Sequence, residues 1–391
     1  MFSVVSANIN IGPNVTAVGH IGPSAPPAGF EQAAAELTVP WQCPFPGNHR
    51  PSSLLSWHSR LSDCKGRDEE MGQLRRWAED QHPIWVRFLV AEGGTGKSRL
   101  AAEFADEMQS QGWAAGFVKL RKPQTFQMNK AGTFLVVDYP EEHPGQLKDL
   151  LEDLAGLGNQ YRIRVLLLTR QSPANFDELV SKARAENIVD NNYMVLSPLS
   201  ADSATEIYNS TVSKVGDHMK SPAGDDLGRG LITAEAMEAW MKDMPENERP
   251  LFITAAAVQS AFNPSDEHVR YSGRDVVMSL AKREADRLDA IGQKRGYKDQ
   301  SALSWLSGMA TIAGGLPLER ATELIEAGHL PLGLDGDSDV KGELQNAGML
   351  EEGRIPPLTP DIVAAAFVHT VLAGGVNRCD ARCISANEGP E

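Results

Sequence analysis

One short run of residues, 91–98, has the composition of a loop that binds phosphate. It reads Ala-Glu-Gly-Gly-Thr-Gly-Lys-Ser, and its glycines let the backbone wrap an anion with no Cβ in the way. In loops of this pattern the lysine, here Lys97, reaches the β- and γ-phosphates, and the hydroxyl of Ser98 ligates Mg²⁺. We therefore predict a nucleotide-phosphate site made by Glu92, Gly93, Gly94, Thr95, Gly96, Lys97, Ser98 and Arg99.

A second metal ligand is expected from an acid at the end of a neighbouring strand. The apolar run 133–137 is followed by Asp138, and ligands of open α/β sheets bind at the edge where such strands end. Alone, Asp138 would be an ordinary acid in a turn. Together with the loop it predicts an Mg²⁺ site formed by Ser98 and Asp138, with Lys97 and Asp138 as catalytic residues.

Hydrolysis of a nucleotide also requires a carboxylate that orients or deprotonates water. Many ATPases place this acid directly after the aspartate, but this chain has Tyr139 there. Glu141 and Glu142 are the nearest acids, and we favour Glu141 as the base. The alternative is that both are solvated loop acids and that turnover is slow.

Arg170 ends another apolar run, residues 165–168, after Thr169. At the end of a strand a guanidinium can face the γ-phosphate and respond to its presence. We predict this sensor role for Arg170. A surface ion pair is the competing interpretation.

These residues need a scaffold that brings them to one edge. Five apolar runs separated by helical stretches predict a parallel sheet covered on both faces. The first run leads into the loop, and Leu100, Phe104 and Met108 then recur with helical spacing. The loop would therefore lie at the N-terminus of a helix, where free backbone N–H groups bind phosphate. The runs are 84–90, 114–120, 133–137, 165–168 and 193–196.

The rest of the chain divides by composition. Residues 1–53 read as an arm and linker, with a short β-ribbon or flexible arm at 8–19 and many prolines after it. The predicted domains are a nucleotide-binding domain at 54–200, a helical domain at 201–298, a small domain at 299–376 and a tail at 377–391. Within the small domain, residues 348–355 predict a hairpin.

Overall composition narrows the class of protein. The 391 residues include 37 Lys and Arg against 52 Asp and Glu, a net charge of −15, which opposes sequence-independent binding to nucleic acid. We therefore expect nucleic acid to be an unlikely partner. Neither a membrane-spanning run nor a secretion signal is evident, and four scattered cysteines suit a reducing compartment. These features predict a cytoplasmic protein with no membrane partner.

In their order along the chain, these motifs resemble the STAND class of P-loop NTPases, the switch ATPases of signal transduction that include the NACHT and NB-ARC families. The resemblance covers about residues 60–370. One further element supports it: Gly66 and Arg67, with Glu70 beyond them, look like the Gly-Arg-x-x-Glu element that borders the adenine pocket in the family. The other elements are the 91–98 loop, Asp138 with acids just beyond it, Thr169-Arg170, and residues 196–200 before a helix.

The resemblance implies a fold and a set of cofactors. The fold would be an α/β P-loop domain with strand order 5-1-4-3-2, followed by a helical lid domain and a winged-helix domain. The cofactors would be ATP or ADP with Mg²⁺. A proline of the helical domain packs on adenine in the family. We favour Pro250, which opens an apolar helix, over Pro317, although Gly315-Leu316-Pro317 matches the family's letters better.

The function that the resemblance implies is a molecular switch. ATP with Mg²⁺ would change the arrangement of the domains and permit homo-oligomerisation, slow hydrolysis would reset it, and an unknown protein would act as sensor or effector. One alternative is an AAA-like ATPase that works on DNA or protein, against which the lack of an acid beside Asp138 speaks. Another is a module that binds nucleotide without cleaving it.

Overall fold

The computed structural model describes residues 6–10, 15–20, 37–43, 53–120, 124–129, 131–157, 161–219, 230–243, 245–262, 272–326, 339–350 and 353–372. The chain forms two compact units, the first from residues 1–41 and 64–200 and the second from 42–63 and 201–391. The chain therefore passes between the units three times, after residues 41, 63 and 200. The finer division predicted from composition stays a prediction.

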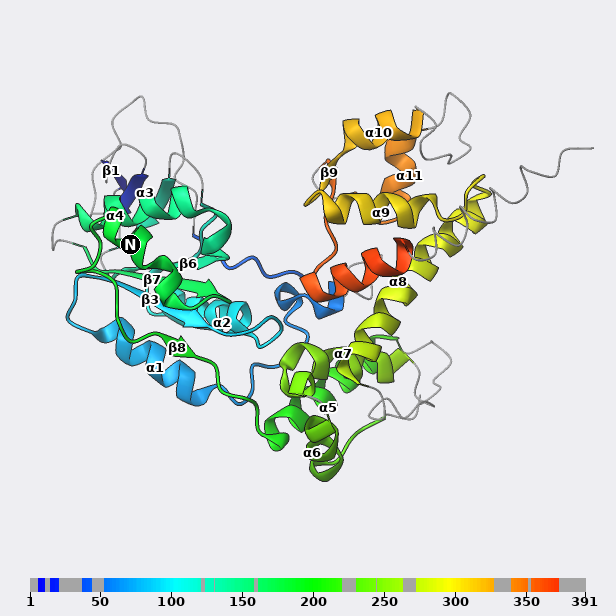
Figure 1. Cartoon of the computed structure of the whole chain (residues 1–391), viewed down its shortest axis with the longest axis horizontal. Coiled ribbons are helices and arrows are strands. Elements are labelled where there is room, and N and C mark those ends of the chain that lie inside the picture. Colours follow the sequence, from blue (N-terminus) through cyan, green and yellow to red (C-terminus); the bar gives the residue numbers. More distant parts are fainter. Residues whose placement is uncertain are drawn as a thin grey trace, which may run out of the picture. The chain divides into compact units, whose positions relative to one another are not determined.

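The first unit is built on a five-stranded parallel sheet in the order β4-β6-β7-β3-β8 (Figure 1). Numbered along the chain, this is the expected order 5-1-4-3-2 reversed, so the predicted α/β P-loop fold is confirmed. The strand that leads into the glycine-rich loop, β3, lies between β7 and β8. The strands are β3 (Ile84–Val90), β4 (Ala114–Phe117), β6 (Thr133–Asp138), β7 (Ile163–Thr169) and β8 (Met194–Val195).

Successive residues of a strand point to opposite faces of the sheet. Here the residues on both faces are apolar, and helices cover both faces. One face packs Phe134, Val136, Leu166 and Leu168 against α1 and α2. The other packs the intervening strand residues, such as Leu167, against α3 and α4. The helices are α1 (Asp68–Glu79), α2 (Lys97–Ser110), α3 (Pro144–Ala155) and α4 (Asp177–Lys182), with the short 3-10 helices η3 (Pro140–Glu142) and η4 (Pro173–Phe176) before α3 and α4.

The N-terminal residues contribute to the first unit. β1 (Ser6–Asn10) and β2 (Val15–His20) form an antiparallel hairpin, so the predicted β-ribbon is present. β2 also pairs in parallel with β5 (Gln124–Met128), an element that the sequence reasoning missed. Further on, the carbonyl of Thr38 accepts from the Phe117 N–H at 3.2 Å. A Cβ on Gly116 would lie 2.5 Å from the Thr38 nitrogen, so the approach of this segment to β4 requires a glycine.

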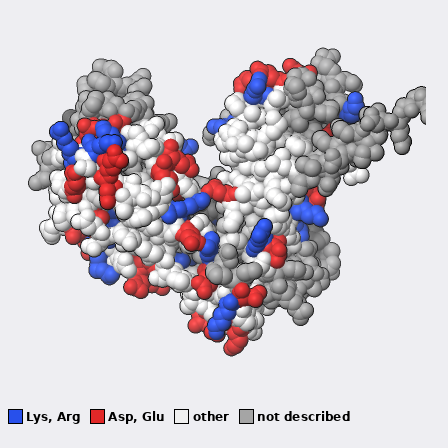
Figure 2. Space-filling view, in the orientation of Figure 1, with Lys and Arg blue, Asp and Glu red and all other residues white. Residues whose placement is uncertain are grey.

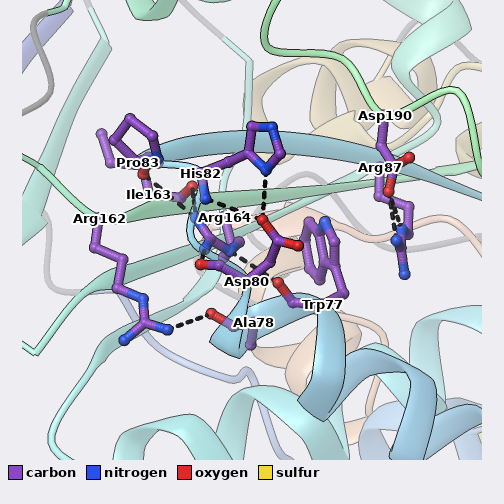
Figure 3. A network of polar contacts seen from close by, with 10 residues as sticks. All are labelled: Trp77, Ala78, Asp80, His82, Pro83, Arg87, Arg162, Ile163, Arg164 and Asp190. Carbon is purple, nitrogen blue, oxygen red and sulfur yellow. Dashed lines mark hydrogen bonds and ion pairs between the residues drawn. The ribbon is translucent and has the colours of Figure 1, made fainter.

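A fully buried arginine on β7 joins the sheet to the end of α1 (Figure 3). The guanidinium of Arg164 donates to the carbonyls of Trp77 at 3.1 Å, Asp80 at 2.6 Å, Pro83 at 3.3 Å and Ile163 at 3.0 Å. Burial lowers the pKa of Arg164 to about 10, and the neighbouring Arg162 adds to this effect. The arginine thus satisfies carbonyls at the C-terminal end of α1, where the partial negative charge of the helix favours a cation.

The second unit is helical. Its central helix, α7 (Pro250–Phe262), is buried from Phe252 to Ala261 and packs against α5 (Ala201–Met219) and α8 (Gly273–Arg295). The other elements are η1 (Ser53–Leu55), η2 (Trp57–Ser59), α6 (Ala234–Asp243), η5 (Pro245–Glu248), α9 (Ala302–Ile312), β9 (Leu316–Pro317), α10 (Leu318–Glu326), α11 (Val340–Asn346), β10 (Arg354–Ile355) and a helix at 361–372.

The predicted hairpin at 348–355 is wrong. β10 pairs antiparallel with β9, the short strand between α9 and α10. Gly348, with φ 66°, instead ends α11, and its N–H donates to the Gln345 carbonyl at 2.9 Å. The partner of β10 lies far away in the sequence, so local pattern could not identify it.

The surface mixes both signs of charge. On the face drawn in Figure 2, blue and red side chains are interspersed over the described residues of both units. Oppositely charged side chains one helical turn apart form ion pairs, among them Lys148 with Glu152 at 2.7 Å and Lys242 with Glu238 at 2.6 Å. Among the residues that the structure describes, no helix combines the length and the apolar character that a membrane-spanning helix needs.

The Arg164 network leads to a stability prediction. Arg164→Met should lower the free energy of unfolding by about 3 kcal/mol or more, since four backbone carbonyls would lose the hydrogen bonds that the guanidinium donates. Arg162→Met is the matched control: among the described residues this exposed arginine donates to the Ala78 carbonyl at 2.9 Å and lies 5.2 Å from the ring of Trp113, and its loss should cost about 1 kcal/mol. Urea unfolding measures both, and equal losses would contradict the assignment.

Candidate nucleotide-binding site

The glycine-rich loop connects β3 to α2, as the sequence predicts. Gly94 and Gly96 have φ values of 82° and 95°, a left-handed conformation that glycine adopts without strain. Gly96 caps α2, and its carbonyl accepts from the Leu100 N–H at 2.9 Å. The backbone N–H groups of the first helical turn therefore point into the loop, where an anion can bind them.

Lys97 is buried at the start of α2 with its side chain folded across the loop. Its Nζ donates to the carbonyls of Ala91 at 2.7 Å and Glu92 at 3.1 Å, and only 7% of the residue is exposed. These carbonyls hold the ammonium at the mouth of the loop, where a phosphate would bind. A phosphate oxygen there carries a negative charge, so it would accept a stronger hydrogen bond from Lys97 than a carbonyl does.

Ser98 and Asp138 meet at the edge of the sheet. The Ser98 hydroxyl donates to Asp138 Oδ2 at 2.7 Å, although 40 residues separate them in the chain. A hydroxyl and a carboxylate are hard oxygen ligands of the kind that Mg²⁺ takes together with phosphate oxygens and water. The residues present therefore fit the predicted Mg²⁺ site.

Two acids follow Asp138 in η3, and the structure distinguishes them. Glu142 is exposed, whereas Glu141 is half-buried. The Oε2 atom of Glu141 is enclosed and has no hydrogen-bond partner among the described residues. An enclosed carboxylate oxygen without a donor is costly unless something binds it. Glu141 therefore has the acceptor that a bound water would need.

Arg170, just past β7, lies against the glycine-rich loop. A Cβ placed on Gly93 would be 3.5 Å from the Arg170 Cζ. The guanidinium also contacts Tyr139: Nη2 donates to the phenol oxygen at 3.1 Å, and Cζ lies 5.2 Å from the ring centroid. The structure thus brings together the loop, the predicted sensor and the residue after Asp138.

Arg67 joins the loop to a distant segment of the first unit. It is buried, and it donates to the carbonyls of Thr95 at 3.2 Å and Ser197 at 2.5 Å. Glu70 pairs with Arg67 at 3.1 Å and accepts from the Ser197 N–H at 3.2 Å. Ser197 had no role among the residues predicted from the sequence. The spacing of three between Arg67 and Glu70 suits a pair on one helix face. It could have predicted the Arg67–Glu70 ion pair, but not the contact with Ser197.

Three other predicted residues have different surroundings. Gly66, with φ 67°, turns the chain into Arg67. Arg99 pairs with Glu103 at 2.9 Å and lies 5.3 Å from the ring of Trp41. Pro250 opens α7 in the second unit. Their contacts with a nucleotide stay predictions.

Comparison with known proteins shows distant likenesses of fold. No family model matches the chain, and no curated protein matches it. A Walker-type ATPase of Pyrococcus abyssi is 12% identical, with a TM-score of 0.37, covering 78% of this chain and 96% of that one. The Aeropyrum pernix ORC1 protein in complex with DNA is 15% identical, with a TM-score of 0.37, covering 83% and 98%. Drosophila ORC bound to DNA is 10% identical, with a TM-score of 0.37, covering 81% and 96%.

Two of these structures contain DNA, contrary to the prediction that nucleic acid is an unlikely partner, and that prediction is wrong as stated. The prediction rested on the net charge of −15 and on basic runs that are short and interleaved with acids. Net charge does not determine the charge of any one face. Otherwise these likenesses concern the fold. The strand order, the loop and the Ser98–Asp138 pair give this chain the fold and the phosphate-binding elements of a P-loop NTPase.

Proposed function

We propose that this chain is an ATPase that binds ATP with Mg²⁺ at the carboxyl edge of its parallel sheet and responds to the state of the nucleotide. The observation that carries the proposal is the hydrogen bond from Ser98 to Asp138 at 2.7 Å, beside a buried Lys97. This pair unites the two oxygen ligands of a magnesium nucleotide at the loop that would hold its phosphates.

Each residue then has a task in the reaction. The loop N–H groups and Lys97 hold the β- and γ-phosphates, and Ser98 and Asp138 hold the metal. When bound, Mg²⁺ neutralises the charge that develops on the phosphate oxygens. Glu141 orients the attacking water through its enclosed Oε2, and Arg170 contacts the γ-phosphate from across the loop.

The Arg67 contacts support a switch over a passive binding module. Arg67 bonds the loop at Thr95 and the chain at Ser197, three residues before the first unit ends at Ser200. Arg67 itself lies three residues after the chain enters the first unit at Cys64. A shift of the loop on binding phosphate would therefore act on two of the passages between the units. Such coupling of the nucleotide site to the passages between the units is the STAND-type switch that we propose, with homo-oligomerisation as its consequence.

The AAA-like alternative, an ATPase that works on DNA or protein, fits the comparisons no worse than the switch. The order α9, β9, α10, α11, β10 in the second unit supports the proposed winged-helix domain, which either class could use. The two differ in turnover. A switch hydrolyses slowly whatever polymer is added, whereas DNA that strongly stimulates turnover would favour the alternative.

The metal site leads to a binding prediction. Asp138→Asn and Ser98→Ala should weaken nucleotide binding in Mg²⁺ by about tenfold or more, ~1.4 kcal/mol, because each removes a metal ligand. Binding in EDTA should not weaken, since no metal is then held and Asp138→Asn removes a negative charge beside the phosphates. Titration of a fluorescent ATP analogue measures both conditions, with the exposed Glu142→Gln as control. A loss of equal size in EDTA would contradict the metal role.

The catalytic base leads to a kinetic prediction. Glu141→Gln should lower kcat by about a hundredfold or more, the usual worth of a positioned general base, and should leave the affinity for ATP intact. Glu142→Gln, one residue away and exposed, should retain wild-type turnover. Phosphate release measures kcat, and Lys97→Ala provides the background. Equal rates for the two glutamine variants would remove Glu141 from the mechanism.

The Arg67 link leads to a prediction about transmission. In the wild type, hydrogen exchange of a peptide covering 196–202 should differ between ADP and a non-hydrolysable ATP analogue with Mg²⁺. Arg67→Met should abolish this difference, since the loop and Ser197 would lose their shared donor. Arg75→Met is the matched control, because this exposed arginine of α1 pairs with Glu107 at 2.6 Å. An unaltered difference in Arg67→Met would exclude this route.

A further inference from the structure

Tyr139 stands in the position that many ATPases give to a carboxylate, and its backbone is unusual. Its φ and ψ are 51° and 55°, the left-handed region that residues with a Cβ rarely adopt. Such a conformation persists only where the surroundings hold it. Here the Tyr139 N–H donates to the Leu168 carbonyl at 3.1 Å, and the buried Pro140 begins η3 directly after it.

The conformation coincides with a double contact between Tyr139 and Arg170. The phenol oxygen accepts from Arg170 Nη2 at 3.1 Å, and the guanidinium carbon lies 5.2 Å from the ring centroid. The hydrogen bond holds one nitrogen of the guanidinium, and the cation–π contact holds the group near the ring. Together they restrict a side chain that otherwise has many rotamers.

The same guanidinium lies against the glycine-rich loop. Its Cζ, Nη2 and Nε atoms are 3.5, 3.6 and 3.7 Å from the point where Gly93 would carry a Cβ. Arg170 therefore contacts Tyr139 and lies beside Gly93. A phosphate held by the loop would find the arginine beside it already.

We propose that Tyr139 is a positioning residue that presets Arg170 against the loop and thereby sets the preference of the chain for ATP over ADP. This inference rests on the proposed function, because Arg170 must contact a γ-phosphate for the preset to matter. A phenol accepts protons poorly near neutral pH, so this position serves detection of the triphosphate. Activation of water is left to Glu141.

The test compares variants that remove the two contacts separately. Tyr139→Phe keeps the ring and removes the hydrogen bond. Tyr139→Asn removes the ring and suits the left-handed backbone, which asparagine tolerates. Tyr161→Phe is the matched control, since Tyr161 precedes β7 at the opposite end of the strand from Arg170. Thermal unfolding of each variant verifies that it folds.

The measured quantity is the ratio of dissociation constants for ADP and for a non-hydrolysable ATP analogue, both with Mg²⁺, in competition with a fluorescent nucleotide. We expect Tyr139→Asn to reduce the preference for the ATP analogue by about fivefold to tenfold and Tyr139→Phe by about twofold to threefold. The affinity for ADP should stay within about twofold, since no γ-phosphate contact is involved. Arg170→Met, which removes the γ-phosphate contact itself, should lose at least as much preference as Tyr139→Asn, and the double variant should lose no more than Arg170→Met.

Distinct outcomes separate this inference from the proposed function. A wild-type chain that binds neither nucleotide would overturn both. A wild type that binds both nucleotides without preference, a Tyr139→Asn variant that keeps the full preference, or additive losses in the double variant would overturn the inference alone. A structural role for Tyr139 would weaken ADP and the ATP analogue equally, which also counts against the proposal.

Discussion

The register of three parallel strands is the constraint on which the site depends. Asp138 at the end of β6 pairs with Leu168 of β7, and Val90 at the end of β3 pairs with Thr169. The ends of these strands therefore lie at one level, and the next residues continue the ladder: the Ala91 N–H donates to the Thr169 carbonyl at 3.2 Å. A shift of one strand by one residue would turn its side chains to the other face and separate Asp138 from Ser98.

Burial on both faces maintains that register. Alternate residues of β6 and β7 enter two different clusters, one under α1 and α2 and one under α3 and α4. Any slip would exchange the two sets, so hydrophobic packing specifies the pairing on both sides. Arg164 is the exception within β7, a buried cation that donates only to backbone carbonyls in the contacts of Figure 3. It ties α1, which Arg67 precedes, to the sheet beneath.

The groups around the loop hold one another in place. The Lys97 ammonium bonds the carbonyls of its own loop, Arg170 bonds Tyr139, and Arg67 bonds Thr95. A bound phosphate would compete for hydrogen bonds from Lys97 and Arg170. Arg67 would keep its bonds to the loop and to Ser197, so a movement of the loop would reach Ser197 through Arg67. The proposed sensing and the proposed transmission thus use different arginines, so each can be altered without removing the other.

Sequence and structure agree where local chemistry determines the outcome. The loop 91–98, its strand and helix, and the apolar strands could be predicted because residue type and spacing specify them within a short window. The strand order came with the resemblance to a family and is confirmed by the pairing. The β-ribbon at the N-terminus could be predicted too, but its parallel partner β5 could not, since over a hundred positions separate them.

Only the tertiary structure decided the contacts between segments that are remote in the chain. The pairing of β9 with β10, the approach of Thr38 to Gly116, and the bonds of Arg67 to Ser197 all join residues that no local pattern connects. The same holds for Tyr139, whose position after Asp138 was visible as a departure from the usual acid, whereas its contact with Arg170 was not. The sequence by itself determined that a phosphate-binding loop and an acid are present, because those depend on residue types. Folding decided which side chains meet there, because that depends on strand register and on burial from both faces.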